Sequence, residues 1–289
     1  MKWQITENEA GLLLRDYLKQ NIGFSRNMIK VLKFDGGKLL VNGENVNVRT
    51  KLKKGDTVEV LFPKEVRAPR LKPVLIPLDI VYEDDFLLVI NKTAGMTTVP
   101  SARHEDKTVA NALIAYYDQK GLDYTVHIVT RLDRDTSGLM LVAKQRFCHS
   151  LLQNNKIDRR YQAVVEGILT SESGTISEPI ARKQGSIIER TVARDGKPAI
   201  THYRTLKQVN GHTWLAIRLE TGRTHQIRVH FAHIGHPLAG DDLYGGQTDK
   251  VKRQALHCVS LAFQHPITKQ YLSFHSSWPD DLAPLVYTH

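Results

Sequence analysis

The chain has 289 residues, 41% of them hydrophobic, and 40 Lys and Arg against 30 Asp and Glu, which gives a formal net charge of +10. This composition supplies enough apolar side chains for a folded core and excludes a disordered chain. No apolar run reaches the roughly 18 residues that a membrane span needs and no signal peptide is visible, so we expect a cytoplasmic protein without a membrane partner.

The excess positive charge is concentrated near the N-terminus. Residues 1–70 hold 14 Lys and Arg against 8 Asp and Glu, a surplus of 6, and the rest of the chain has a surplus of 4. A basic surface of this kind indicates a polyanionic partner. The segment FPKEVRAPRLKPVLIPLD contains four prolines, which remove backbone donors and predict an extended linker. We expect an N-terminal domain over residues 1–65, a linker over residues 66–78 and a larger domain over residues 79–289.

The first half of the N-terminal segment predicts two short helices, over residues 12–20 and 25–33. Ser25 is a suitable N-cap for the second helix. Apolar side chains recur on one face of this helix, and three basic side chains share another stripe by the same spacing: Arg26, Lys30 and Lys33. A basic helical stripe suits a phosphate backbone, although a solvated helix face explains three charges equally well.

A hairpin and a strand follow these helices. Asn42 and Gly43 are typical of a two-residue hairpin turn, and residues 57–62 alternate as a half-buried strand does. This helix-helix-hairpin order over residues 11–62 resembles the small RNA-binding domain first described in a ribosomal protein, the S-four type. The stretch Arg-Asn-Met-Ile-Lys departs from the more usual Arg-Ser-Gln-Ala pattern of that domain. The resemblance implies that the basic stripe of the second helix contacts RNA.

Beyond residue 78 the sequence predicts many strands and few helices. Residues 86–90 and 138–143 are short apolar runs typical of buried strands, and Asp106 is expected to cap a helix in which apolar residues repeat every four positions. Several later strands are separated by turns too short for a crossover helix. We therefore predict an α+β fold with a mainly antiparallel mixed sheet and flanking helices. The later strands are expected at residues 161–166, 200–208, 212–220, 256–263 and 271–275.

The densest polar segment is HIVTRLDRDTSG, at residues 127–138. Carboxylates beside apolar layers are costly unless they are paired or hydrogen-bonded. If strand alternation is continued backwards from the following apolar run, Leu132 faces the core and Arg131 and Asp133 face the opposite side, toward a cleft. Asp133 is therefore a candidate nucleophile or general base. A turn that satisfies local backbone groups explains the next three polar residues: Asp135, Thr136 and Ser137.

At this cluster the sequence resembles a known enzyme family. TRLDRDTSGLMLVAK is similar to the signature of pseudouridine synthases of the RluA branch, in which the Asp after Arg-Leu is the nucleophile. Three other family segments occur in the expected order: YEDDFLLVINKTAGM at 82–96, RRYQAVVEG at 159–167 and GRTHQIRVHFAHIGHPLAGDDLYGG at 222–246. Four ordered motifs make chance similarity implausible. Thr130 stands where this branch usually has His, and Thr93 where Pro commonly follows Asn-Lys.

The resemblance implies the pseudouridine synthase fold and a role for each matching residue. Asp133 would attack the target uridine, at a carbon that the sequence does not decide, and Arg228 would pair with it and favour its ionised form. Tyr161 would stack on the uracil and take the proton from carbon five, beside an apolar wall formed by Ile227. Arg131 would enter the space left by the flipped base. The reaction replaces a carbon-nitrogen glycosidic bond with a carbon-carbon bond, so it needs no metal or organic cofactor.

Four histidines between residues 225 and 236 suggest a metal site. However, Ile227, Phe231 and Ile234 place an apolar face through the same segment at helical spacing, and a separation of five residues does not bring His225 and His230 side by side. The segment has no HExxH pattern and no cysteine. We therefore expect no bound metal and assign these histidines to packing and RNA contact.

Two other classes of function remain open. A metal-dependent nuclease would use Asp133, Asp135 and Asp241 with two cations and would lose activity in a chelator. A non-catalytic RNA-binding module would bind RNA equally well without the Asp133 carboxylate. The resemblance favours an enzyme that acts on large-subunit ribosomal RNA or on transfer RNA. We expect a monomer with no obligate protein partner.

Overall fold

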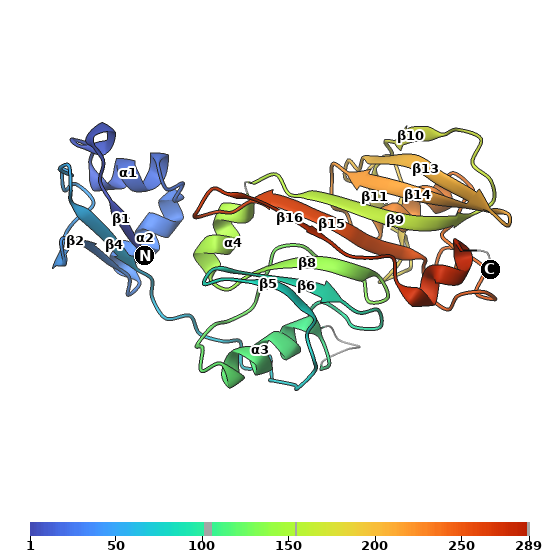
Figure 1. Ribbon diagram of the computed structural model, residues 1–289, viewed down its shortest axis with the longest axis horizontal. Helices are drawn as coiled ribbons and strands as arrows, with labels where there is room; N and C mark the ends of the chain where they lie inside the picture. The colour runs from blue at the N-terminus through green and yellow to red at the C-terminus, as the bar shows by residue number, and fades with distance from the viewer. Residues whose placement is uncertain (101–105, 154, 288–289) are drawn as a thin grey trace.

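The computed structural model describes residues 1–100, 106–153 and 155–287 (Figure 1). Its first 61 residues, here called the N-terminal module, form an antiparallel sheet in the order β1-β4-β2-β3. Apolar side chains of two helices pack on this sheet. The elements of the module are β1 (Lys2–Gln4), the 3-10 helix η1 (Glu7–Glu9), α1 (Leu14–Gln20), α2 (Arg26–Phe34), β2 (Lys38–Val41), β3 (Glu44–Asn45) and β4 (Thr57–Leu61).

The helices and the hairpin of the module agree with the prediction from the sequence. The Ser25 hydroxyl accepts a hydrogen bond from the Met28 amide at 3.1 Å and caps α2. Asn42 and Gly43 have φ angles of +53° and +85°, as a tight hairpin turn between β2 and β3 requires. Strand β1 was not predicted, because three residues are too few to show an alternating pattern.

The remainder of the chain forms one ten-stranded sheet in the order β10-β13-β14-β9-β15-β8-β6-β5, with β16 beside β15 and β7 beside β8. Every pairing of the described strands in it is antiparallel except that of β8 with β15, so the predicted α+β fold with a mainly antiparallel mixed sheet is confirmed. Its strands are β5 (Ile80–Glu83), β6 (Leu87–Lys92), β7 (His127–Ile128), β8 (Ser137–Ala143), β9 (Asp158–Glu166), β10 (Ser173–Ile176), β13 (Thr201–Val209), β14 (His212–Leu219), β15 (Leu256–Gln264) and β16 (Tyr271–His275).

Three α-helices and a small hairpin accompany this sheet. The helices are α3 (Val109–Gln119), α4 (Arg146–Gln153) and α5 (Gln226–His233); the hairpin pairs β11 (Ile180–Arg182) with β12 (Arg190–Val192), and the 3-10 helix η2 covers Asp280–Leu285. The expectation that Asp106 caps α3 is wrong. Thr108 is the N-cap, and its hydroxyl accepts from the Asn111 amide at 3.3 Å.

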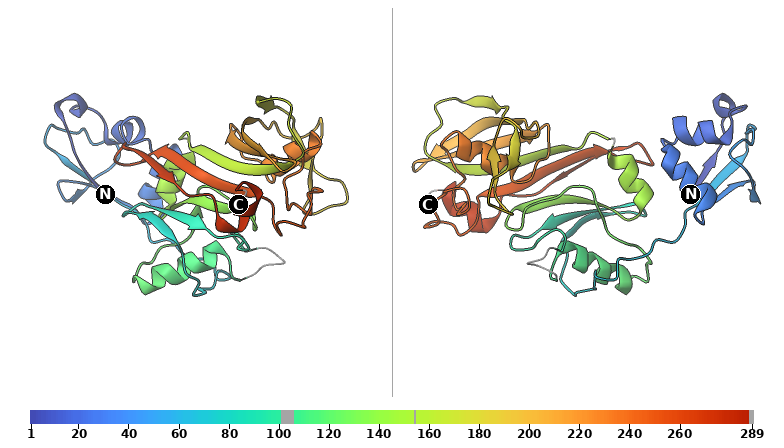
Figure 2. Two further views of the ribbon diagram at one scale, coloured as in Figure 1. Left: turned by 45° about the vertical axis from the view of Figure 1, so that its right-hand side comes forward. Right: turned by 180° about the vertical axis from the view of Figure 1, so that it is seen from behind.

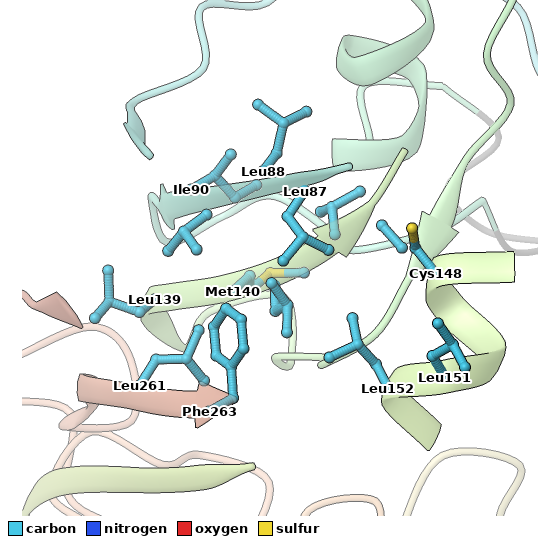
Figure 3. Close-up of a cluster of buried hydrophobic side chains, with 14 of the residues drawn as sticks. Leu87, Leu88, Ile90, Leu139, Met140, Cys148, Leu151, Leu152, Leu261 and Phe263 are labelled. Carbon is cyan, nitrogen blue, oxygen red and sulfur yellow. The ribbon is translucent and has the colours of Figure 1, made fainter. Parts of the chain in front are cut away.

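Strands β6 and β8 run through the centre of the core. Leu87, Ile90 and Met140 are almost fully buried, and all seven residues of β8 are buried. Figure 3 shows these side chains packed with Leu261 and Phe263 of β15 and with the apolar face of α4. Burial on both faces is the reason that both strands read as continuous apolar runs. Strand β8 is therefore a rigid support for the loop that precedes it.

The N-terminal module and the residues that directly follow it meet the rest of the chain near the C-terminal end of β8. Phe62 stacks on Phe147 of α4 with ring centroids 4.3 Å apart, and the Glu65 carboxylate accepts from the Arg146 amide at 2.7 Å. Asp133 precedes the other end of β8, and a seven-residue strand spans about 20 Å. The module and the start of β8 therefore lie toward opposite ends of the strand, as Figures 1 and 2 show.

Candidate active site

The loop that carries Asp133 is held in place by side chains from three other segments. The hydroxyl of Thr98 donates to the Leu132 carbonyl at 2.7 Å. The ammonium group of Lys92 donates to the Arg134 carbonyl at 2.8 Å, and the guanidinium of Arg253 donates to the carbonyl of the next residue at 3.0 Å. Because the carbonyls on both sides of Asp133 are held in this way, the direction of the Asp133 side chain is fixed as well. Such support preorganises a catalytic group.

Two further residues shape the loop where it enters β8. The buried hydroxyl of Thr130, one of the two departures from the family pattern, accepts from the Leu141 amide at 2.8 Å. Gly138 has a φ of +112°, and a Cβ there would lie 2.4 Å from the Cys258 carbonyl oxygen. Only glycine therefore allows β8 to approach β15 this closely beside the loop.

Five residues singled out in the sequence line one small pocket of about 60 Å³. They come from three places in the chain, because Arg131 and Asp133 lie on the loop, Tyr161 lies on β9, and Ile227 and Arg228 lie on α5. Burial follows the predicted alternation, since Leu132 is buried and Arg131 is exposed. The rest of the lining is Leu132, Thr136, Leu219, Arg223, His225, Gln226 and Leu256.

Arg228 connects Asp133 to a second, fully buried carboxylate. Its Nε and Nη2 donate to the two oxygens of Asp241, each at 2.7 Å, and its Nη1 donates to Asp133 Oδ2 at 3.3 Å. Burial opposes the charge of this guanidinium, but the hydrogen bonds and the charge of Asp241 outweigh it and raise the pKa of Arg228. Asp241 therefore orients the guanidinium that faces Asp133. The sequence offered Asp241 only as a possible nuclease ligand.

His225 is the functional candidate that the sequence least revealed. Its Nε2 lies 3.9 Å from Asp133 Oδ1, and its Nδ1 is 2.8 Å from the hydroxyl of Tyr244. It precedes α5 with a φ of +56°, a left-handed conformation that is rare outside glycine. Burial lowers the pKa of His225 although Asp133 acts against it, so the imidazole beside the carboxylate is neutral. In the sequence it belonged to the histidine cluster and to the family segment at residues 222–246, but neither indicated a role beside Asp133.

Tyr161 is buried against the pocket, with Ile217 and Cys258 opposite it on the neighbouring strands. Burial raises the pKa of Tyr161, and the charge of Asp133 adds to that rise. The phenol therefore keeps its proton at neutral pH. Its ring and its hydroxyl proton, rather than a phenolate, face any ligand of the pocket.

Comparisons with known proteins agree with this geometry. Residues 86–233 match the model of the RNA pseudouridylate synthase family, and residues 1–58 match the RluD ribosomal pseudouridine synthase N-terminal domain. The chain belongs to the RNA pseudouridylate synthase family. It is 48% identical over 269 residues to the uncharacterized RNA pseudouridine synthase YjbO of Bacillus subtilis, a match that covers 92% of this chain and 95% of that protein.

Proteins whose names specify the large ribosomal subunit are also similar to this chain in sequence. The chain is 43% identical to ribosomal large subunit pseudouridine synthase D of Vibrio parahaemolyticus, over 91% of this chain and 86% of that one. The fold matches human RNA pseudouridylate synthase domain containing 1 with a TM-score of 0.59 at 24% identity, over 73% of this chain and 86% of that one. The resemblance seen in the motifs is thus confirmed, and the protein is an RNA pseudouridine synthase with an RluD-type N-terminal domain.

Two further histidines near α5 have ordinary hydrogen-bond partners. His230 lies 2.9 Å from the hydroxyl of Thr201 and 2.9 Å from the carbonyl of Glu178, and His236 Nδ1 lies 2.7 Å from the Glu166 carbonyl. Within residues 1–100, 106–153 and 155–287, no group of three or more metal-ligating side chains is placed to hold an ion. Ile234, expected on the buried face of α5, is 37% exposed because the helix ends at His233.

The carboxylates of the nuclease alternative are occupied by arginines. Asp135 accepts from the Arg134 guanidinium at 2.8 Å, and both oxygens of Asp241 are bound by Arg228. The GDDLYGG segment at residues 240–246 forms a turn, in which the Gly246 amide donates to the Asp241 carbonyl at 2.8 Å. None of the described helices is both long and apolar enough to cross a bilayer.

A buried hydrogen-bonded chain lies behind the loop of Asp133. The Ser137 hydroxyl is 2.8 Å from His257 Nδ1, His257 Nε2 is 3.0 Å from the Ser276 hydroxyl, and that hydroxyl donates to Asn91 at 3.1 Å. Because Ser276 gives its proton to Asn91, His257 donates from Nε2 and accepts from Ser137 at Nδ1. Burial, helped by the charge of Arg253, lowers the pKa of His257 to about 4.

The lowered pKa of His257 leads to a prediction of how stability depends on pH. The unfolded chain binds a proton at His257 below about pH 6.5, whereas the folded chain does so only below about pH 4, so the free energy of unfolding falls as the pH falls through this window. Between pH 7 and pH 5 the loss from this group should be about 2 kcal/mol. In urea titrations at both pH values, His257→Gln should show a smaller loss than the wild type by that amount. Equal losses in the two proteins would contradict a neutral His257.

The three basic residues of α2 lie away from this pocket. Arg26, Lys30 and Lys33 are exposed, and Lys33 lies over the ring of Phe34 at 4.5 Å. Helix α2 belongs to the module that contacts the far end of β8. The structure therefore brings together the five predicted pocket residues but not the basic stripe. A ligand that contacts both must extend along the molecule.

Proposed function

We propose that Asp133 is the nucleophile with which this pseudouridine synthase isomerises uridine in RNA. The observation that carries the proposal is the position of its carboxylate, one quarter exposed in the pocket and 3.3 Å from a buried guanidinium. The guanidinium of Arg228 donates to this carboxylate and holds it in place, and a carboxylate oxygen is a nucleophile. The carbon-nitrogen bond between the uracil and the ribose breaks, and the uracil turns in the pocket. A bond from carbon five of the uracil to the ribose then replaces it.

The other pocket residues act on the base. Leu132, Ile227 and Leu256 supply apolar walls, and the ring of Tyr161 stacks on the uracil. Because the phenol holds its proton tightly, we assign Tyr161 to stacking and hydrogen bonding rather than to proton removal from carbon five. The proton that carbon five loses passes instead to the Asp133 carboxylate, a base that lines the same pocket, and from there to N1 of the uracil. Arg131, exposed at the pocket, fills the space that the flipped uridine leaves in the RNA. Base flipping costs a few kcal/mol, which stacking and phosphate contacts offset.

We further propose large-subunit ribosomal RNA as the substrate, because relatives more than 40% identical over most of the chain are named for it. We also propose that the RNA-binding module comprises residues 1–65, that residues 66–78 connect it to the catalytic domain over residues 79–289, and that the enzyme acts as a monomer in the cytoplasm. Light scattering on the purified protein gives its mass in solution.

The experiment that tests the function uses the purified enzyme and an unmodified transcript of large-subunit ribosomal RNA. Pseudouridine is counted by mass spectrometry of RNA fragments before and after incubation. We expect pseudouridine to appear at one or a few positions of this transcript. Incubation of the same enzyme with a transfer RNA transcript should produce no pseudouridine. Intact RNA without pseudouridine would contradict the function, and cleaved RNA would favour the nuclease.

The basic stripe of α2 makes a separate prediction about RNA binding. Arg26→Gln, Lys30→Gln and Lys33→Gln together should weaken binding and reduce the slope of log K against log salt by about 2, since each lost phosphate contact contributes roughly 0.7. The triple variant Lys120→Gln, Lys156→Gln and Lys207→Gln, here called the surface control, removes three exposed charges that line neither the pocket nor α2. Identical slopes for the two variants would mean that the stripe is only a solvated helix face.

A further inference from the structure

A second concave surface adjoins the candidate active site. The β11–β12 hairpin, the segment at residues 195–197 and the loop at residues 222–224 enclose a cleft of about 430 Å³, here called the hairpin cleft. Four cationic side chains line it, against the single carboxylate of Asp195. The four are Arg182, Arg190, Lys197 and Arg223.

The backbone of the hairpin forces these charges together. Arg182 and Arg190 are directly paired across β11 and β12, and side chains so paired point to the same face. The Lys197 segment is joined to Ile180 by two backbone hydrogen bonds of 2.9 Å, which adds it to the same small sheet. A Cβ at Gly196 would lie 2.6 Å from the Ile180 backbone, so this approach requires glycine. Like charges placed opposite each other destabilise a sheet unless an anion compensates them.

The protein itself supplies little compensation for this charge. In the described part of the chain none of the four cations forms an ion pair. Arg190 donates from Nη1 to the carbonyls of Ile188 and Glu189 at 3.1 Å, and Arg223 donates from Nε to the Pro198 carbonyl at 2.9 Å. These bonds hold the two guanidinium groups in place and leave their other N–H groups available to a ligand.

The position of the cleft indicates which anion it binds. Arg223 lines both the hairpin cleft and the pocket of Asp133, so the two surfaces are continuous. A uridine that enters the pocket carries a phosphate on each side of its ribose, and the RNA strand must continue from it along the surface. Guanidinium forks match phosphate oxygens in geometry and charge.

We propose that the hairpin cleft binds the phosphodiester backbone of the nucleotides that flank the target uridine. This inference rests on the proposed RNA substrate and adds the path of the strand, from the pocket past Arg223 to Arg182, Arg190 and Lys197. The contacts are to phosphates and carry no base specificity. They stabilise the bound, flipped strand and take no part in the chemical step.

The test combines RNA binding and turnover on the full-length enzyme with the large-subunit ribosomal RNA transcript. Arg182→Gln, Arg190→Gln and Lys197→Gln together should raise KM about 10-fold, leave kcat at saturating RNA within about twofold of the wild type, and reduce the salt slope of binding by about 2. The surface control should change none of these. Thermal melting of each variant reports whether the fold is intact.

Two further variants separate charge from hairpin structure. Arg182→Lys with Arg190→Lys keeps both charges and should retain the salt slope of the wild type. Asp195→Asn removes the only carboxylate of the cleft and should lower KM about twofold and steepen the slope, a gain that a damaged hairpin would not produce.

The results that would contradict phosphate binding at the hairpin cleft differ from those that would contradict the proposed enzymatic function. A wild-type enzyme that forms no pseudouridine contradicts the proposed function. An active wild type whose triple glutamine variant keeps its KM and salt slope shows that the cleft binds no phosphate. A triple variant that folds and binds RNA normally but loses kcat also overturns the proposal, because the cleft would then act on the chemical step.

Discussion

Asp133→Asn should lower kcat for pseudouridine formation by at least about 1,000-fold while RNA binding stays within about twofold of the wild type. The amide has the shape of the carboxylate and its oxygen can still accept from Arg228 Nη1, so the loop and the pocket should be preserved. What the variant lacks is the negative oxygen that forms a bond to the uridine. The amide oxygen is a far weaker nucleophile.

A carboxylate in the same loop supplies the matched control. Asp135 is two residues away and is held by Arg134 at 2.8 Å outside the pocket lining. Asp135→Asn removes the same charge from the same loop and should keep activity within about tenfold. Single-turnover measurements with the RNA transcript give kcat, and filter binding gives affinity. Full turnover by Asp133→Asn would refute the nucleophile assignment.

Arg228→Met should reduce the free energy of unfolding by about 3–5 kcal/mol, because it leaves the fully buried Asp241 carboxylate without its partner. It should also abolish detectable turnover, since the guanidinium that faces Asp133 is lost. Arg228→Lys keeps a charge but loses the two-pronged contact with Asp241, and we expect values between those of Met and the wild type. Urea unfolding and kcat are measured on each protein.

A double variant separates the two roles of Arg228. Arg228→Met combined with Asp241→Leu replaces the buried ion pair by apolar side chains and should recover most of the lost stability. Its kcat should remain at the level of the single variant, because no guanidinium then contacts Asp133. Recovery of both stability and turnover would show that Arg228 is only structural. Asp241→Asn alone should lose both stability and turnover, because Asp241 orients the guanidinium of Arg228.

The prediction of the fold succeeded where the signal was local. The Ser25 cap, the hairpin turn at Asn42 and the continuous apolar runs of β6 and β8 depend on residues that are neighbours in the chain. Helix α4 was missed although its buried residues recur at helical spacing, because the segment has no N-cap signal. The misplaced cap of α3 was an error of two residues, since both Asp106 and Thr108 are suitable N-cap types.

The candidate site could be predicted only as far as its motifs extend. Asp133, Tyr161 and Arg228 could be singled out as candidates because each lies in a segment that resembles the pseudouridine synthases, and the structure places all three in one pocket. The supporting residues Lys92 and Arg253 were not recovered as supports, because their bonds reach carbonyls 42 and 118 residues away in the chain. The burial that lowers the pKa of Lys92 to about 7 is also a property of the folded state alone.

The family, the type of fold and the candidate residues of the site could be predicted from the sequence, because they depend on local patterns and on ordered motifs. The tertiary structure alone decided how those residues meet. It placed Asp241 behind Arg228, His225 beside Asp133 and the cationic hairpin next to the pocket. Each of these arrangements brings together residues that belong to different segments of the chain. No pattern within a short stretch of sequence records such a contact.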